Sequence, residues 1–389
     1  MEIRINLNEL IYYLAVLLLS VLFIFVGNRI VSEDTANDHA GEADYFHTGV
    51  VTNIFSRGDI PWGDESGGTE ITFYVRITSE ERRGEIVRAE QRLLYFFAIN
   101  EREVSIGDRV ILYLDPWSET FNFAGYARIN RIIVLGVVFL VLVILFGKKK
   151  GFNAIVALGF TCMAVFFVFI PAILAGRNIY ITTIVICIYA IVSTLLIVIG
   201  PNKKALSAML GCLGGVLFSS LLMFIMDLLL RLTGNVDRDI QFLLHLENPV
   251  DIRALIFAGV VLGAVGAIMD VAMSISSSLW ELKETGGVSD FRSILKSGIT
   301  IGKDILGTML NTLILAYIGS TLWLILLISA HNPVPIMLFN SEMVIVEFLR
   351  ALVGSFGMLL AIPLTAAICG WFYAATATKE TEQPEEYVI

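Results

Sequence analysis

The sequence has little charge. Of its 389 residues only 16% are Asp, Glu, Lys or Arg, whereas an average soluble protein carries about 25%. Hydrophobic residues make up 56%, and the mean hydropathy is +0.78. Apolar runs of about 20 residues recur, and this is the length that a helix needs to cross the hydrocarbon core of a bilayer. The composition excludes an ordinary soluble domain and predicts an α-helical polytopic membrane protein, with the lipid bilayer as its first partner.

The motifs of common catalytic sites are also missing. The chain has no Walker A loop, no HExxH and no GxSxG, so nothing indicates an ATPase, a metalloprotease or a serine hydrolase. No basic patch suggests nucleic acid. The cysteines form no CxxC pair and all lie in apolar runs, which is typical of small buried side chains. They are Cys162, Cys187, Cys212 and Cys369. The sequence therefore predicts no cofactor, no metal ion and no nucleic-acid partner, and favours a protein that is not an enzyme.

About eight apolar runs are present. The first, 10–26, has one basic residue before it and no Ala-x-Ala-like site after it, so it indicates an uncleaved anchor. The other seven centre on 132–147, 152–175, 179–200, 205–230, 253–280, 305–329 and 353–375. The chain is thus divided into an anchor (1–27), an extracytoplasmic β-rich domain (28–128), a seven-helix transmembrane domain (129–378) and an acidic cytoplasmic tail (379–389).

The basic residues of the short loops predict the orientation. Lysines cluster after the second span, at 148–150, and after the fourth, at 203–204, and Lys and Arg recur between the sixth and seventh, from Lys283 to Lys303. The alternate loops are poorer, and 331–340 has no Lys or Arg. This bias places both termini in the cytoplasm and the polar region outside, in a bacterial cytoplasmic membrane.

The polar region predicts a small β domain. The runs 48–55, 70–78, 85–94 and 109–114 are rich in β-branched and aromatic residues, as strands are. Gly and Pro mark 58–68 as a loop, and 105–110 has the form of a turn that enters a strand, so we expect a compact barrel or sandwich of OB-like pattern. His39 and His47 stand eight residues apart near acidic residues, which favours a solvated linker over a metal site.

The sixth span carries most of the functional information. Its small and polar residues recur every three or four positions, so they share one helix face. These residues are Gly263, Gly266, Asp270, Ser274, Ser277 and Glu281. The face is small in its outer half, where another helix can approach closely, and polar in its inner half.

Asp270 is expected near the middle of the membrane. It precedes Glu281 by eleven residues, which is about 16 Å of helix. A carboxylate at that depth costs about 2.5–3.5 kcal/mol on the insertion scale. Two interpretations stay open: a contact for an ion, proton or substrate, and a structural Asp that is hydrogen-bonded to a neighbouring helix.

The seventh span adds a second polar face, formed by Asp304, Thr308 and Asn311. If this helix runs antiparallel beside the sixth, Asn311 lies within about one helical turn of Asp270 in depth. Asp270, Ser274, Thr308 and Asn311 would then form one polar cluster.

Other helices show cues for packing. Stripes of small residues on the fifth and eighth spans are typical of close helix contacts. They include Gly211 and Gly215 on the fifth, and Gly354 and Gly357 on the eighth. Pro171 and Pro363 predict kinks. The stretch 342–352, with Glu347 and Arg350, is amphipathic and is expected on the outer membrane surface.

The segments GAVGAIMDVAMSISSSLWEL and DILGTMLNTLILAYIGS resemble the YibE/F-like family of bacterial multispanning membrane proteins. The resemblance takes in the β domain and the first anchor, and implies a protein of the cytoplasmic membrane without implying an activity. It points to Asp270, Asp304 and Asn311 as functional residues.

Two functions of different kinds fit these patterns. One is a secondary transporter or permease for an ion or small solute, favoured by the buried polar face and the lack of an ATP-binding motif. The other is a membrane assembly or accessory protein whose β domain binds a partner or an envelope component, working with a second copy or another membrane protein. A lipid-modifying enzyme ranks third, because only Asp270, Asp304 and Glu281 could serve as acid–base groups. No inverted repeat, a common transporter signature, is evident.

Overall fold

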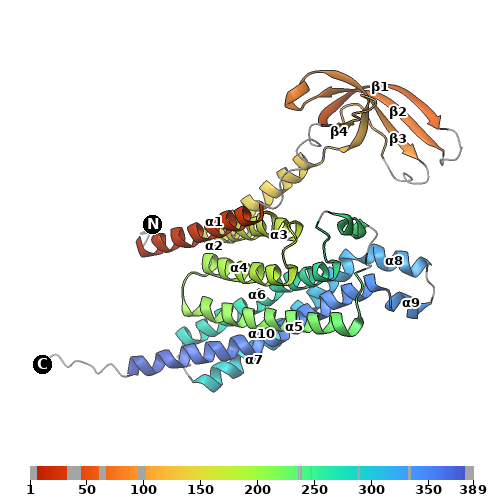
Figure 1. The fold of residues 1–389 in the computed structure, drawn as a ribbon. Helices are drawn as coiled ribbons and strands as arrows, with labels where there is room; N and C mark the ends of the chain where they lie inside the picture. The colour runs from red at the N-terminus through yellow and green to blue at the C-terminus, as the bar shows by residue number, and fades with distance from the viewer. Residues whose placement is uncertain are drawn as a thin grey trace. The chain divides into compact units, whose positions relative to one another are not determined.

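The structure is a computed structural model of the full chain, and it describes residues 7–32, 45–60, 67–94, 102–234, 236, 239–246, 248–286, 290–331 and 334–381. Its internal contacts divide the chain into two compact units. One is Ala36–Phe146, which holds a β-barrel. The other joins Met1–Thr35 to Gly147–Ile389 and is helical (Figure 1). Each unit is described by itself.

The β-rich domain is a closed five-stranded barrel. Its strands are β1 (Phe46–Ile60), β2 (Gly68–Ile77), β3 (Ile86–Leu94), β4 (Arg109–Leu114) and β5 (Phe121–Tyr126). They follow the order β1-β2-β3-β5-β4, and β4 closes the barrel by pairing with β1. All pairs are antiparallel except β3–β5. The long strand β1 thus pairs with β2 on one edge and β4 on the other.

Alternating apolar residues fill the barrel. Phe73, Val75 and Ile77 of β2 are fully buried, and they pack with Val110 and Leu112 of β4. A period of two residues on each strand places these side chains on the inner face. The expectation of a separate small β domain is therefore confirmed, with its own core.

Two details of the barrel differ from the sequence prediction. Strand β5 was not predicted, because FNFAGY contains Asn and Gly, which are depleted in strands; pairing with β4 and β3 sets its conformation. The predicted loop 58–68 begins as strand instead, since β1 continues to Ile60 and pairs there with Gly68. Of the predicted solvated linker, His39 falls outside the described residues, whereas His47 lies in β1 and is buried, so the prediction is wrong at His47.

Long helices dominate the rest of the chain. They are α1 (Leu7–Ser32), α2 (Ile129–Ala164), α3 (Ile170–Leu174), α4 (Ile179–Val198), α5 (Lys203–Leu230), α6 (Ile252–Gly286), α7 (Phe291–Ser320), α8 (Leu322–His331), α9 (Pro335–Phe339) and α10 (Glu342–Thr381). Over the residues that the structure describes, seven helical stretches are long and apolar enough to cross a membrane. The prediction of about eight differs because two predicted spans lie in one stretch, Ile129–Leu174.

That stretch is interrupted twice. Lys148 has non-helical backbone angles (φ 48°, ψ −127°), so α2 bends between the two predicted spans. Further on, a π-helical turn, Val165–Phe169, precedes Pro171 in the first turn of α3. Proline lacks an N–H and disrupts the helical ladder, which accounts for the irregularity expected at this position.

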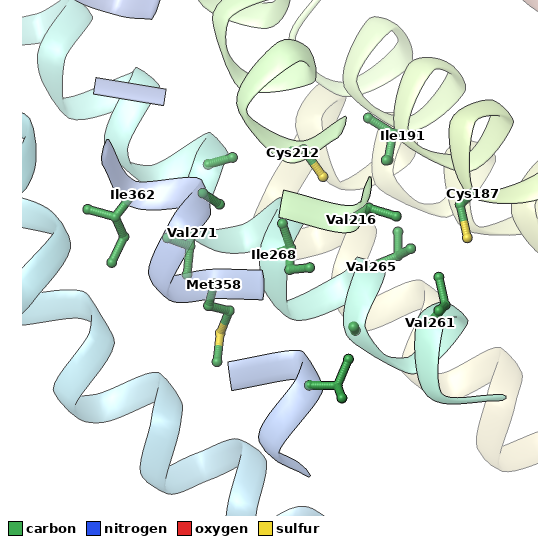
Figure 2. Packing of buried hydrophobic residues seen from close by; sticks show 14 of the residues in the cluster. Cys187, Ile191, Cys212, Val216, Val261, Val265, Ile268, Val271, Met358 and Ile362 are labelled. Atoms are coloured by element: carbon green, nitrogen blue, oxygen red, sulfur yellow. The ribbon is translucent and has the colours of Figure 1, made fainter. Parts of the chain in front are cut away.

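The core of the helical unit lies where α4, α5, α6 and α10 meet. Helix α10 packs against α5, α6 and α7, and Figure 2 shows the interdigitated side chains. Ile268 of α6, Val216 of α5 and Met358 of α10 are among the buried residues labelled there. Three of the four cysteines (Cys187, Cys212 and Cys369) are buried and unpaired, as small apolar side chains, whereas Cys162 is exposed on α2.

Small residues let α5 and α10 approach closely. A Cβ added at Gly215 would lie 2.9 Å from the carbonyl oxygen of Gly357, and one at Gly357 would overlap Ser219 Oγ. Ser219 in turn donates a hydrogen bond to the carbonyl of Val353 (3.2 Å). The contact at Gly211 is equally close, because a Cβ added there would overlap the side chain of Thr365. Such contacts are typical of helices that associate within a membrane.

Two predicted boundaries are wrong. The stretch 342–352 is not a separate surface segment but the first three turns of α10, with Val344, Val346 and Leu349 buried. The span predicted at 305–329 begins earlier, since α7 starts at Phe291 and ends at Ser320. Its early turns bury Gly298 and Gly302 against α10, and this tertiary contact stabilises a helix where the local charge suggested a loop.

We expect the barrel to fold alone. Residues 45–128 expressed as a soluble domain should give a β-type circular dichroism spectrum and a cooperative melt. Phe73→Ala should lower the free energy of unfolding by about 3–5 kcal/mol because it opens a core cavity. Trp117→Ala removes an aromatic that is 95% exposed and should change it by less than about 0.5 kcal/mol. A random-coil spectrum, or equal effects of the two changes, would contradict this fold.

Two glycine substitutions in the helical unit form a second matched pair of variants. Gly357→Leu should destabilise the full chain by about 1–3 kcal/mol, because it overpacks the α5–α10 contact. Gly266→Leu should not, since an added Cβ there meets no heavy atom of the described residues within 4 Å. Thermal unfolding of the purified protein in detergent measures both. An equal loss at the two positions would mean that the helices pack differently.

Candidate functional site

The polar face predicted on α6 lies on one continuous helix. Val265, Ala272 and Leu279 on the opposite face are buried in the core. The polar face therefore points away from α5 and α10. The glycines at 263 and 266, Asp270 and Glu281 are exposed on this face, and Ser274 and Ser277 are half-buried.

Helix α7 runs antiparallel beside α6. A Cβ added at Gly298 of α7 would lie 3.0 Å from Cδ1 of Leu279 on α6. A Cβ added at Gly263 of α6 would lie 3.0 Å from Oη of Tyr317 on α7. Interpolation between these contacts places Asp270 level with residues 307–310 of α7. Asn311 is then within about one helical turn of Asp270 in depth.

The residues predicted to form a cluster are near in depth but are not hydrogen-bonded to one another. Thr308 donates its hydroxyl proton to the carbonyl of Ile305 on its own helix (3.0 Å). Asp304 and Asn311 are exposed on α7. Within the part of the chain that the structure describes, no hydrogen bond or ion pair involves Asp270, whose carboxylate thus has free acceptor capacity.

Three further residues extend this face toward the start of α10. Arg350 Nη1 donates to Glu347 Oε1 (2.7 Å), and Nη2 lies 3.7 Å from an added Cβ at Gly259 of α6. Tyr317 approaches α6 one turn further along, at Gly263. The sequence does not predict this ion pair, because the amphipathic stretch 342–352 is expected on the outer membrane surface. The i,i+3 spacing of Glu347 and Arg350 is the available signal.

We call the whole row the polar track. It follows the exposed face of α6 from the level of Gly259 to Glu281, with further members on α7 and at the start of α10. Its members are Glu347, Arg350, Tyr317, Gly263, Gly266, Asn311, Asp270, Thr308, Ser274, Asp304, Ser277 and Glu281.

Charge along the polar track is mainly negative near its middle. Asp270 is 18 residues from the start of α6 and 16 from its end, so it is central. Inside a bilayer such a carboxylate must meet water, a ligand or a partner group, because exposure to lipid is costly. The track can therefore contact a hydrophilic solute, a cation or a proton at mid-span.

The barrel presents a different feature. The turn between β4 and β5 is held by Asp115, whose carboxylate accepts from Ser118 Oγ (2.7 Å) and from the Trp117 N–H (2.9 Å). These hydrogen bonds hold the pKa of the Asp115 carboxyl below its usual value. The turn leaves Trp117 almost fully exposed. The half-exposed Phe46 packs at a tilted angle of 48° against Tyr113 (centroids 5.2 Å apart) at the same end of the barrel.

Among the described residues, no group of three or more His, Cys, Asp or Glu side chains could hold a metal ion. His47 is buried in the barrel (3% exposed), with Nδ1 3.4 Å from Ser79 Oγ and its ring beside Phe121. Its surroundings are those of a packed core residue.

Comparison with known proteins identifies the helical part. The model of the family described as "YibE/F-like protein" matches residues 135–375. This range includes α6, α7 and most of α10, and with them the polar track; the barrel and α1 lie before it. Neither the curated proteins nor the solved structures give a match. Because the family model covers more than half of the chain, the protein belongs to the YibE/F-like family.

Proposed function

We propose that the chain is a multi-pass membrane protein that moves an ion or small solute across the bacterial cytoplasmic membrane as a secondary transporter or permease. One observation carries the proposal: Asp270 lies at the middle of an apolar helix, on its exposed face, with no bonded partner among the described residues. An acid in that position is rarely tolerated without a function.

The surroundings of Asp270 support a pathway rather than an isolated contact. Polar or small residues continue in both directions along this exposed face of α6, so a hydrophilic solute could follow the face. Asn311 and Thr308 add hydrogen-bonding groups from α7 at nearly the same depth. Because Asp270 and Asp304 are both acidic, a cation or a proton is the favoured substrate or coupling ion.

The membrane topology follows from the basic loops. We place both termini in the cytoplasm and the barrel outside, which needs eight crossings. The seven long helical stretches provide them if Ile129–Leu174 crosses twice, on either side of Lys148. Its 46 residues would extend about 69 Å as a straight helix, roughly twice the bilayer's hydrocarbon thickness.

The accessory role remains the second candidate, and the barrel favours it. We interpret the strand order β1-β2-β3-β5-β4 with its parallel β3–β5 pair as OB-like, and OB barrels bind ligands near the β4–β5 loop. Here that loop holds Trp117 outward on a hydrogen-bonded turn. An exposed aromatic on a rigid turn suits contact with an envelope polymer or a protein partner.

Cysteine labelling tests the topology. In a background without the four native cysteines, Trp117→Cys should react with a membrane-impermeant maleimide on whole cells. Glu284→Cys, at the exposed end of α6, should react only after the cells are permeabilised. Labelling of both positions, or the reverse pattern, would overturn the orientation.

Asp270→Asn tests the function. The change keeps the size of the side chain and removes its charge, so a transport residue should lose most activity while the protein keeps its thermal stability. A structural Asp would instead lose about 1–3 kcal/mol of stability through a broken buried hydrogen bond. Purified protein in liposomes, screened over cations, anions and protons, gives the activity, and thermal unfolding gives the stability.

The matched control is Glu284→Gln, which removes a carboxylate charge from the same helix outside the polar track. It should leave both transport and stability unchanged. If Asp270→Asn is stable and fully active, Asp270 has no part in transport, and the accessory role becomes the better account.

A further inference from the structure

A small cavity lies between α7, α8, α9 and α10. Its volume is about 170 Å³. The walls are almost wholly aliphatic and aromatic, with Ile318 of α7, Leu324 of α8, Phe339 of α9 and Phe348 of α10 among them. Glu347, Tyr317 and Thr321 are the polar residues of the lining.

Glu347 has an unusual environment in this cavity. Its side chain is 19% exposed. Oε1 accepts the hydrogen bond from Arg350 Nη1, but Oε2 is buried and has no hydrogen-bond partner in the part of the chain that the structure describes. A buried acceptor without a donor is costly, and a donor that reaches a carboxylate forms one of the stronger hydrogen bonds in proteins. The cavity therefore combines apolar walls with one unused strong acceptor.

These two properties define a ligand. The apolar walls require an apolar body, and Glu347 Oε2 requires an N–H or O–H donor. Arg350 already balances the carboxylate charge, so the donor need not be charged. Pockets for drug-sized ligands measure about 300–1,000 Å³, and this one is smaller, so its occupant has about ten non-hydrogen atoms or fewer.

We propose that the cavity binds a small uncharged molecule with an aromatic or aliphatic body and a single hydrogen-bond donor, of the phenol, indole or short-alcohol class. Glu347 Oε2 accepts the donor, and the apolar side chains of α7, α8 and α10 enclose the body. The aromatic class is favoured because Phe339 and Phe348 lie close together (ring centroids 6.4 Å apart) and Tyr317 adds a third ring. The site does not depend on transport through the polar track.

Phenol and toluene test the proposal on the full chain in lipid nanodiscs. The two probes have nearly the same shape, but toluene has no donor. Saturation-transfer NMR, corrected for binding to empty nanodiscs, gives the affinities. Phenol should bind at least about tenfold more tightly than toluene, since one charge-assisted hydrogen bond separates them.

Three variants assign the binding to this cavity. Glu347→Gln should weaken phenol binding about tenfold or more and leave toluene unchanged. Ala351→Leu, at a buried lining position, should fill the space and abolish binding of both probes. Leu352→Phe adds bulk at the next position of α10, which is half-exposed and outside the lining, and should have no effect.

Several results would overturn the proposal. Equal affinity for phenol and toluene would show a purely apolar cavity, filled by lipid chains or by nothing specific. Phenol binding that survives Ala351→Leu would place the ligand elsewhere. If Glu347→Gln fails to fold, the comparison of the two probes on the unmodified chain and on Ala351→Leu still decides the outcome.

Discussion

The close contact of α10 with α5 and α6 determines the arrangement of the helical unit. Gly215, Ser219 and Gly357 bring backbone against backbone, and dispersion between packed surfaces holds helices together where lipid is as apolar as the side chains. With α5 and α10 on one side, α6 buries Val265 and Ile268 there and turns Asp270 the other way. The polar track is a consequence of this packing, because α5 and α10 cover the opposite face of α6.

Much of the fold could be predicted from the sequence because the bilayer and the β-barrel impose strong patterns. Apolar runs predicted the ends of α4 and α5 within about two residues, and enrichment in β-branched and aromatic residues predicted four of the five strands. The failures have a common cause in tertiary contacts. Strand β5 exists through its partners, the first turns of α7 are stabilised by Gly298 and Gly302 against α10, and the start of α10 is helical although its charges suggested a surface segment. The local sequence does not predict these tertiary contacts.

The candidate site, like the fold, could be predicted only in part from the sequence. Spacing alone put the glycines, Asp270 and the serines on one face of α6, and the antiparallel placement of α7 brings Asn311 to a similar depth. Spacing could not say that this face would be exposed rather than enclosed by other helices, since burial depends on where α5 and α10 pack. It also could not add Glu347, Arg350 and Tyr317, which come from other helices and meet α6 only in three dimensions.

We propose that the exposed face of α6 meets water at mid-membrane. Charged thiol reagents test it most directly, because a cysteine reacts as its thiolate, which needs water. Single cysteines at Gly266, Asp270 and Ser274 should react, in a cysteine-free background, at least about tenfold faster than cysteines at Leu217 and Leu221, which are exposed apolar positions of α5. Reaction at 266, 270 and 274 no faster than at 217 and 221 would show that the face is covered by lipid or protein, and would contradict a hydrophilic pathway.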